Sequence, residues 1–178
     1  MLEIMHGFLE RQLASHEKIG QKIGSCGGVD MIKVMTIADY EELFTMWKNT
    51  PNMGLRSLDD SKEGISRFLS RNPNTNFVAY ENNKLVGAIL SGHDGRRGYI
   101  YHTVVLPEYR GRGIASDLVE KAVEALQKEG ITRVCLNVME TNEQGKRFWI
   151  NKGWEKKDFL GFYSKAITDK ENLPLFTI

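Results

Sequence analysis

The chain has 178 residues, of which 41% are hydrophobic and 26% charged, as expected for one ordinary globular domain. Its 24 basic and 23 acidic residues give a net charge of +1, which argues against nucleic acid as a main partner. The sequence contains neither an apolar run of about 18 residues nor a basic start followed by an apolar segment, so we expect no membrane partner and no secretory signal.

The cysteines indicate a reducing compartment. Only Cys26 and Cys135 occur, and neither CxxC nor a His/Cys spacing suited to zinc is present. We therefore expect reduced thiols, a cytoplasmic location and no bound metal.

Residues 1–30 differ in composition from the rest and end in a Gly-Gly pair shortly before Met31. A purine-rich ribosome-binding site read in frame would encode Gly-Gly. One hypothesis is therefore that Met31 is the natural start, and that residues 1–30 are a translated leader or a disordered extension. The alternative is a short amphipathic helix that docks on the domain or on a partner, with an apolar face made of Met5, Phe8, Leu9 and Leu13.

Two helices follow a predicted first strand at 32–35. Either Asp60 or Ser61 can serve as the N-cap of the second helix, whose apolar positions are Ile65, Phe68 and Leu69. The first helix covers about 37–48 and has one apolar face at helical spacing, made of Tyr40, Leu43, Phe44 and Trp47.

Beyond the second helix the pattern changes to strands joined by turn sequences. Runs at 77–80, 85–90 and 99–106 predict an antiparallel meander of three strands. The later elements are a helix that begins after Gly113, a strand at 133–138, a helix at about 142–152 and a final apolar and aromatic stretch at 159–167.

Arg-Gly-Arg-Gly at 110–113, between the meander and the next helix, predicts an anion site. A helix N-terminus carries about half a positive charge and several unpaired amides. Gly111 and Gly113 remove the side chains that would keep a phosphate from those amides, and Arg110 and Arg112 add charge.

Two common types of phosphate-binding loop do not fit this stretch. A Walker loop needs Gly-Lys-Ser/Thr, which the chain lacks. A dinucleotide fingerprint would need a third glycine where Ser116 stands, and a parallel strand-helix-strand unit in place of the meander. The remaining alternative is a tight turn that only starts a helix.

The loop resembles the phosphate loop of the GNAT superfamily of acetyl-CoA-dependent N-acyltransferases: Arg or Gln, two residues, Gly, one residue, Gly or Ala. Arg110, Gly113 and Ala115 satisfy that pattern. The resemblance covers about 31–167, running back through Val-Leu-Pro-Glu-Tyr at 105–109 and forward through Val138, Asn142, Phe148 and Gly153. SGHDGRRG followed by VLPEYRGRGIA is most similar to small bacterial YpeA-like and ribosomal-protein-acetylating members.

The resemblance implies an α/β (α+β) fold of the GNAT type. Its mixed, mostly antiparallel central sheet has about six to seven strands, flanked by about four helices and splayed between the fourth and fifth strands. The chain then divides into an extension at 1–30, an acetyl-CoA-binding N-acetyltransferase domain at 31–167 and a C-terminal tail at 168–178.

The resemblance also implies where acetyl-CoA binds and where CoA is released. Amides of the loop hold the pyrophosphate, and the open edge of the preceding strand pairs with the pantetheine arm. The implied residues are Val104, Val105, Leu106, Arg110, Gly111, Arg112, Gly113, Ile114, Ala115 and Asn142. Thr141-x-x-Gln144 is also a capping-box pattern, which explains a polar residue at 142 without any ligand.

The chain departs from the family at the usual general-acid tyrosine, where it has Trp149. An indole N–H donates but does not exchange a proton at useful pH. The departing thiolate has a pKa of about 8.5, so water can protonate it. Deprotonating an alkylammonium of pKa about 10.4 at pH 7 is harder, at roughly 4–5 kcal/mol.

Candidate catalytic residues lie on the strand that precedes the loop. Strict alternation puts Tyr99 and Tyr101 on one face and His102 on the other. We interpret the tyrosines as relays for an ordered water and His102 as a base if its face is open, with packing on the sheet as the alternative. Glu140 is a further candidate base, although a glutamate at a helix entry also serves the helix dipole.

Because no strong base is evident, an α-amine acceptor is attractive: its pKa of about 7.7–8.0 lowers the deprotonation cost to about 1 kcal/mol. The family's acceptor loop corresponds to Met53, Leu55 and Arg56, which we predict to contact substrate. Asp59 and Asp60 could attract a cation, although helix capping explains Asp60 equally well.

The sequence leaves two functions open. The first is an N-acetyltransferase in which a primary amine of a peptide, protein or small molecule attacks bound acetyl-CoA directly, in a monomer or homodimer. Cys135 would suggest a covalent route, but it lies inside a predicted strand and is more typical of a small buried residue. The second is a catalytically weak acyl-CoA-binding protein.

Overall fold

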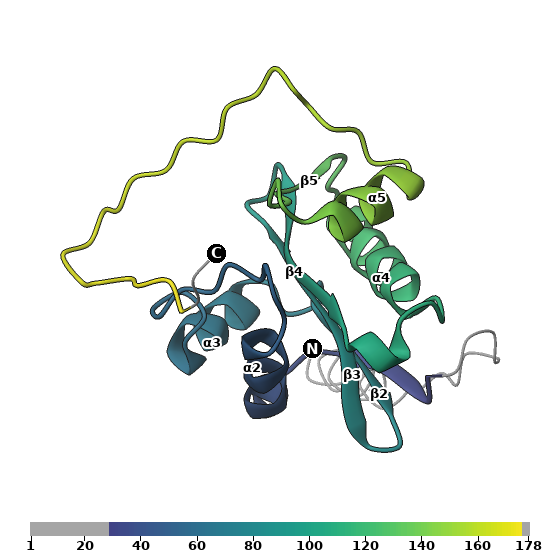
Figure 1. Ribbon diagram of the computed structural model, residues 1–178. Helices are drawn as coiled ribbons and strands as arrows, with labels where there is room; N and C mark the ends of the chain where they lie inside the picture. The colour runs from purple at the N-terminus through teal and green to yellow at the C-terminus, as the bar shows by residue number, and fades with distance from the viewer. Residues whose placement is uncertain (1–28, 176–178) are drawn as a thin grey trace, which may run out of the picture.

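The computed structural model describes residues 29–175 (Figure 1). The leader, disorder and amphipathic-helix hypotheses fall on residues outside this range, as does Cys26. The division into extension, domain and tail stays a prediction.

A five-stranded sheet lies at the centre of the described chain, with its strands in sequence order from β1 to β5 (Figure 1). The first four are antiparallel neighbours, which confirms the predicted meander, and the fifth lies parallel to the fourth. The strands are β1 (Met31–Val34), β2 (Phe77–Glu81), β3 (Lys84–His93), β4 (Gly98–Val105) and β5 (Val134–Leu136).

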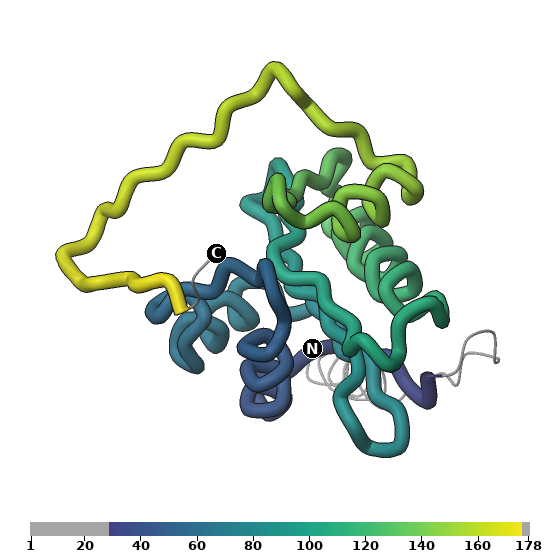
Figure 2. The backbone as a smooth tube through the Cα atoms, viewed as in Figure 1, coloured from purple at the N-terminus to yellow at the C-terminus, as the bar shows by residue number. Residues whose placement is uncertain are grey.

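Four α-helices within residues 29–175 cover the two faces of this sheet, α2 and α3 on one side and α4 and α5 on the other (Figures 1 and 2). Ser61, not Asp60, caps α3, because its Oγ accepts the amide of Gly64 at 3.0 Å. The helical elements are η1 (Ile37–Asp39), α2 (Tyr40–Lys48), α3 (Lys62–Arg71), η2 (Pro107–Tyr109), α4 (Ile114–Lys128) and α5 (Glu143–Asn151). Every helix in this range is too short or too polar to span a bilayer.

The apolar core has one cluster on each side of the sheet. Leu43 and Trp47 of α2 are fully buried on one side, and Leu118 and Ala122 of α4 on the other. These are the faces that the helical periodicity predicts, so burial of the apolar stripes fixes both helical layers on the sheet.

The pairing of β3 with β4 contains a bulge. Leu90 lies opposite His102, but the next residue of β3, Ser91, lies opposite Ile100. Tyr101 is therefore the extra residue. A bulge interrupts side-chain alternation, so residues 101 and 102 need not face opposite ways.

The sheet opens between β4 and β5. The two strands pair only from Gly98–Val134 to Ile100–Leu136, whereas β4 continues to Val105. Beyond Ile100, the β5 side of β4 has no strand beside it among the described residues. The predicted splay between the fourth and fifth strands is confirmed.

The aromatic stretch at 159–167 adds no strand, which is why five strands are seen where about six to seven were expected. The chain beyond α5 instead arcs away from the body and returns near α3 (Figures 1 and 2). Within residues 159–167 its large exposed apolar side chains are Phe159, Leu160, Phe162, Tyr163 and Ile167. The returning end pairs with the loop before α3 through the Arg56–Pro174 bridge and the bond from the Leu175 amide to the Leu55 carbonyl, 3.0 Å.

Candidate active site

The N-terminus of α4 has the geometry of an anion site. Gly113 is its N-cap at φ +83°, and Gly111 precedes it at φ +75°, both in the left-handed region that favours glycine. A Cβ built on either residue meets no protein atom within 4 Å. The first amides of a helix have no preceding turn to bind, so the loop leaves them open to an anion.

The two arginines of the loop are engaged with the protein. Arg110 donates from Nε to the Val105 carbonyl at 3.0 Å and from Nη1 to Gln144 Oε1 at 3.2 Å. Arg112 donates from Nη2 to Glu81 Oε2 at 2.8 Å. The charge of Arg112 is therefore offset by Glu81, whereas Arg110, among the described residues, bonds only neutral acceptors and keeps its positive charge beside the backbone amides.

The open edge of β4 ends beside this loop. Val104 and Val105 are only 4% and 7% exposed, so their side chains belong to the core and only their backbone can pair with an extended ligand. Ile114, 2% exposed, likewise offers only its amide and anchors α4. Leu106 follows the last residue of β4 on this edge. Its amide donates a hydrogen bond to the Val86 carbonyl of β3 at 2.9 Å.

Asn142 is the N-cap of α5. Its side-chain oxygen accepts the amide of Gly145 at 2.8 Å. Capping therefore accounts for this oxygen, although the capping residue is Asn142 and not the Thr141 of the predicted box. Contact between Asn142 and a pantetheine arm stays a prediction.

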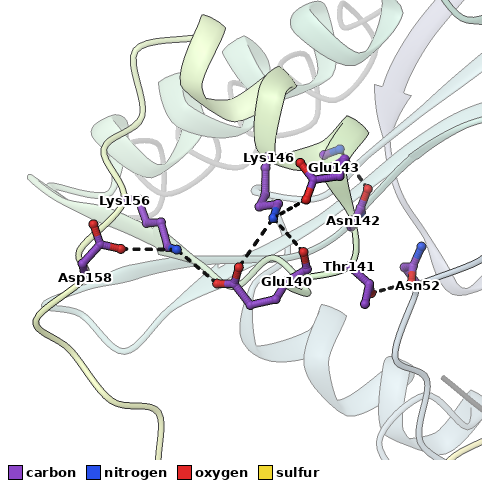
Figure 3. A network of polar contacts seen from close by, with 9 residues as sticks. Asn52, Glu140, Thr141, Asn142, Glu143, Lys146, Lys156 and Asp158 are labelled. Carbon is purple, nitrogen blue, oxygen red and sulfur yellow. Dashed lines mark hydrogen bonds and ion pairs between the residues drawn. The ribbon is translucent and has the colours of Figure 1, made fainter.

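Glu140 is tied into an exposed ionic network at the entrance of α5 (Figure 3). Its carboxylate pairs with Lys156 at 3.2 Å and with Lys146 at 3.5 Å, and Lys146 also pairs with Glu143 at 2.6 Å. The hydrogen bond from Lys156, with the charges of both lysines, lowers the pKa of Glu140. A carboxylate held in its ionised form is a weak proton acceptor, so Glu140 is set aside as the base.

Tyr99 lies within the β4 stretch that pairs with β5, and Tyr101 begins the open stretch; they are 36% and 53% exposed, with ring centroids 5.8 Å apart. Loss of hydration raises the pKa of Tyr101, and the nearby Tyr99 and Asp94 raise it further. Tyr101 is therefore neutral at physiological pH, as the relay interpretation requires.

His102 faces the same side of the sheet as Tyr101, so the prediction that they face opposite ways is wrong. The ring of Tyr101 contacts Phe68 of α3 at 5.4 Å between centroids, and the ring of His102 contacts Trp47 of α2 at 4.9 Å. The bulge at Tyr101 is the physical reason, because it adds one residue to β4 and breaks the alternation.

Asp60 joins this group, a contact that the sequence pattern does not predict. Its Oδ1 lies 2.8 Å from Nε2 of His102, and the two side chains are 7% and 12% exposed. The pattern around Asp60 suggested a cap or a cation attractant, and nothing local pointed to a residue on β4.

The three residues of the predicted acceptor loop lie in different surroundings, and their contact with an acceptor stays a prediction. The Leu55 side chain is 1% exposed and belongs to the core. Met53 is half-buried against the same core. Arg56 reaches the C-terminal segment, where its Nη1 donates to the Asn172 carbonyl at 3.4 Å, and Asp59 accepts the Asn172 side-chain amide at 2.7 Å. No pattern in the sequence indicated that this segment covers the loop.

Trp149 packs against other aromatic side chains. Its ring makes edge contacts with Phe148 and Trp154, at centroid distances of 5.1 and 5.0 Å.

Cys135 is half-buried on β5, opposite Tyr99, and its thiol is free. Within residues 29–175 no three His, Cys, Asp or Glu side chains are arranged to hold a metal ion.

Comparison with known proteins identifies the fold and the family. The family described as "Acetyltransferase (GNAT) family" matches residues 38–154. An acetyltransferase of Pectobacterium atrosepticum is 31% identical over 140 residues, which are 79% of this chain and 98% of the relative. The PaiA N-acetyltransferase of Thermoplasma acidophilum in complex with coenzyme A superposes with a TM-score of 0.63 at 21% identity, over 72% of this chain and 91% of that one.

A further solved structure, the ribosomal-protein-alanine N-acetyltransferase of Brucella melitensis, has a TM-score of 0.59 at 19% identity, over 78% of this chain and 99% of that one. The predicted acyltransferase activity and the acetyl-CoA cosubstrate agree with these findings. The loop with Gly111 and Gly113 at the N-terminus of α4, beside the splayed strand β4, is therefore more than a tight turn that starts a helix. The chain belongs to the acetyltransferase (GNAT) family.

Proposed function

We propose that the protein transfers the acetyl group of acetyl-CoA to a primary amine, by direct attack within a ternary complex. The observation that carries this proposal is the position of the open β4 edge. It runs from the amides at the N-terminus of α4 to the polar group formed by Tyr99, Tyr101 and His102. A cosubstrate extended along that edge would bring its thioester toward these side chains.

We infer that the preferred acceptor is an α-amine, such as the N-terminus of a peptide or protein, or a small-molecule amine of similar basicity. The polar group contains one imidazole and two phenols, and Glu140 is neutralised by lysines. Such a site suits an amine of pKa about 8, which loses its proton at pH 7 for about 1 kcal/mol, against roughly 4–5 kcal/mol for a lysine side chain. The acceptor named for the Brucella protein is of the same kind.

In this reaction the protein's own groups bind and orient. The amides of residues 110–115 hold the anionic end, and the β4 backbone holds the arm. Tyr99 and Tyr101 donate hydrogen bonds to ordered water or to the acceptor. Arg56 and Met53 remain the proposed contacts from the acceptor loop, and the predicted cytoplasmic location and monomer-or-homodimer state stay predictions.

The test is amine-dependent release of CoA from acetyl-CoA across N-terminal peptides, polyamines, amino acids and aminoglycosides, with each product identified by mass. We expect turnover of at least one α-amine, with a higher kcat/KM at pH 7 than for lysine side chains. Faster turnover of lysine side chains or polyamines would contradict the α-amine preference. The intact protein incubated with acetyl-CoA alone should keep its mass, whereas an acetylated protein that passes its group to the amine would contradict direct attack.

Tight CoA binding without turnover of any amine would favour the second function, an acyl-CoA-binding protein. The packing role of Trp149, at the family's usual acid position, is the observation that keeps this alternative open. Titration calorimetry with CoA, run beside the activity panel, separates the two.

A further inference from the structure

We propose that Asp60 is a positioning residue that orients His102 as the proton acceptor for the incoming amine. This inference rests on the proposed function, because it concerns how the same site removes a proton from its acceptor. It is carried by one contact, the 2.8 Å hydrogen bond between Asp60 Oδ1 and His102 Nε2, joining the loop before α3 to the bulged part of β4.

The carboxylate of Asp60 is held from several directions. Its Oδ2 accepts the backbone amide of Arg56 at 2.6 Å, and its backbone amide donates to the Arg56 carbonyl at 3.0 Å. Its backbone carbonyl accepts the hydroxyl of Tyr40 at 2.9 Å. Oδ1 is left for the imidazole. A side chain fixed in this way sets the direction of its hydrogen bond without loss of rotamer freedom on binding.

His102 is the one ionisable side chain that the structure pairs with Asp60 among residues 29–175. Among residues 29–175 no lysine or arginine side chain forms an ion pair with Asp60. Burying an ionised carboxylate destabilises the folded protein unless the carboxylate is paired and hydrogen-bonded. Removing the partner therefore leaves the desolvation free energy of the carboxylate uncompensated. Burial raises the pKa of two phenols beside the pair, Tyr40, whose hydroxyl bonds the Asp60 carbonyl, and Tyr101, which precedes His102 on β4. The charged side chains next to Asp60 in its own loop, Arg56 and Asp59, both bond Asn172 instead.

The geometry selects one tautomer of the imidazole. With Nε2 bonded to a carboxylate, the hydrogen lies on Nε2 and the lone pair lies on Nδ1. Nδ1 of His102 accepts no hydrogen bond from the described residues. The ring plane is restrained by Trp47, whose ring lies 4.9 Å away, and 12% of the side chain stays exposed. His102 therefore has a free acceptor nitrogen, a fixed ring and access from outside.

The proton balance of the step is simple. The Nδ1 lone pair takes one proton from the ammonium group, and the freed nitrogen pair forms a bond to the acetyl carbon. The carbon–sulfur bond breaks, its electron pair leaves on sulfur, and the thiolate takes the second amine proton. The imidazolium, stabilised by Asp60 through Nε2–H, later gives its proton to water.

The experiment measures kcat/KM against pH from 6 to 9 with an α-amine acceptor. At pH 7 we expect His102→Gln to lose about 5- to 10-fold, the factor by which the neutral form of an α-amine is depleted at that pH, and Asp60→Asn to lose up to the same factor. Both losses should shrink toward pH 9, where the amine is already neutral and needs no acceptor. Asp39→Asn is the matched control, since Asp39 is also a buried carboxylate, 4% exposed, but pairs with Lys33. It should lose stability without any pH-dependent loss of activity.

A second measurement needs no variant of Asp60. The ¹⁵N shifts of His102 in the wild-type protein, assigned by their absence from His102→Gln, report the tautomer directly. We expect hydrogen on Nε2, and hydrogen on Nδ1 would overturn the inference. Wild-type turnover with an Asp60→Asn loss that is equal at every pH would overturn the inference alone, whereas absence of wild-type turnover would overturn the proposed function with it.

Discussion

Adding one methyl group at Gly113 tests the anion site most directly. The residue sits at φ +83°, where an L side chain costs about 1–2 kcal/mol of stability. For a chain of this size that corresponds to a fall of about 2–8 °C in Tm. The added Cβ meets no protein atom within 4 Å, so the methyl group projects into open space at the N-cap of α4, and we expect it to compete there with a bound anion.

Gly113→Ala should weaken CoA binding, because the added methyl group would compete with the pyrophosphate for the space next to the α4 amides. Displacing a pyrophosphate from one amide removes a charge-assisted hydrogen bond worth about 1.5–3 kcal/mol, or about 10- to 150-fold in Kd. Calorimetric titration with CoA measures this change, and a thermal scan measures the stability.

Gly130→Ala is the matched control, because Gly130 follows the other end of the same helix at φ +80° and also has nothing within 4 Å of a built Cβ. We expect a similar fall in Tm and an unchanged Kd. Equal CoA affinity in the two variants would refute the assignment of the α4 N-terminus as the pyrophosphate site.

Three further predictions concern single side chains. Trp149→Phe should lower stability by about 1–2 kcal/mol, because the ring packs on its aromatic neighbours, and should leave kcat/KM within about twofold; a collapse of kcat in a folded variant would contradict a packing role. Glu140→Gln should leave the pH dependence of kcat/KM unchanged, since lysines hold that carboxylate ionised, and a lost acidic limb would restore it as a base. Burial opposes ionisation of Asp39, but hydrogen bonds led by the one from Lys33 prevail and hold its pKa below 3.8. Its contribution to stability is therefore present above about pH 4 and is lost as the pH falls through the lowered pKa. Urea unfolding between pH 2 and 7 should show a steeper acid loss for wild type than for Asp39→Asn, and parallel curves would argue against this.

Local patterns predicted most of the architecture. The apolar spacing over 37–48 became η1 and α2, and the alternating runs became β2, β3 and β4. These predictions succeed because burying one face of a helix or strand is a local requirement that leaves a period in the sequence. The phosphate loop was equally predictable from the sequence, since only glycine adopts its positive φ angles without strain.

The side of the sheet on which His102 lies could not be predicted from the sequence. A bulge shifts register by one residue, and the run Tyr-Ile-Tyr-His-Thr is compatible with a regular strand or a bulged one. Strict alternation was therefore the natural prediction, and it separated two side chains that the bulge brings to one face.

Contacts between distant segments were also out of reach. Asp60 and His102 are separated by 42 positions, and the pairing of Leu175 with Leu55 joins the C-terminal end of the described chain to the loop before α3. Neither leaves a periodic signal. Helix capping was a sufficient explanation for the polar residues Asp59 and Asp60, so nothing in the sequence indicated contact between Asp60 and His102.

The arc between α5 and the returning C-terminal segment has an entropic consequence. Closing a flexible span of about 20 residues, from the end of α5 at Asn151 to residue 172, costs roughly 2–3 kcal/mol of loop entropy, which the bonds of residues 172–175 to the loop before α3 must offset. These bonds lie at the surface, through Asn172, Leu173 and Leu175. We therefore expect this segment to open locally while the sheet stays folded, so that the amide hydrogens of Ser57 and Leu58, which bond Leu173 and Asn172, exchange faster than those of the sheet. Asp60, which bonds the imidazole of His102, lies in the same loop two residues beyond Leu58, so the segment covers the loop that holds this contact.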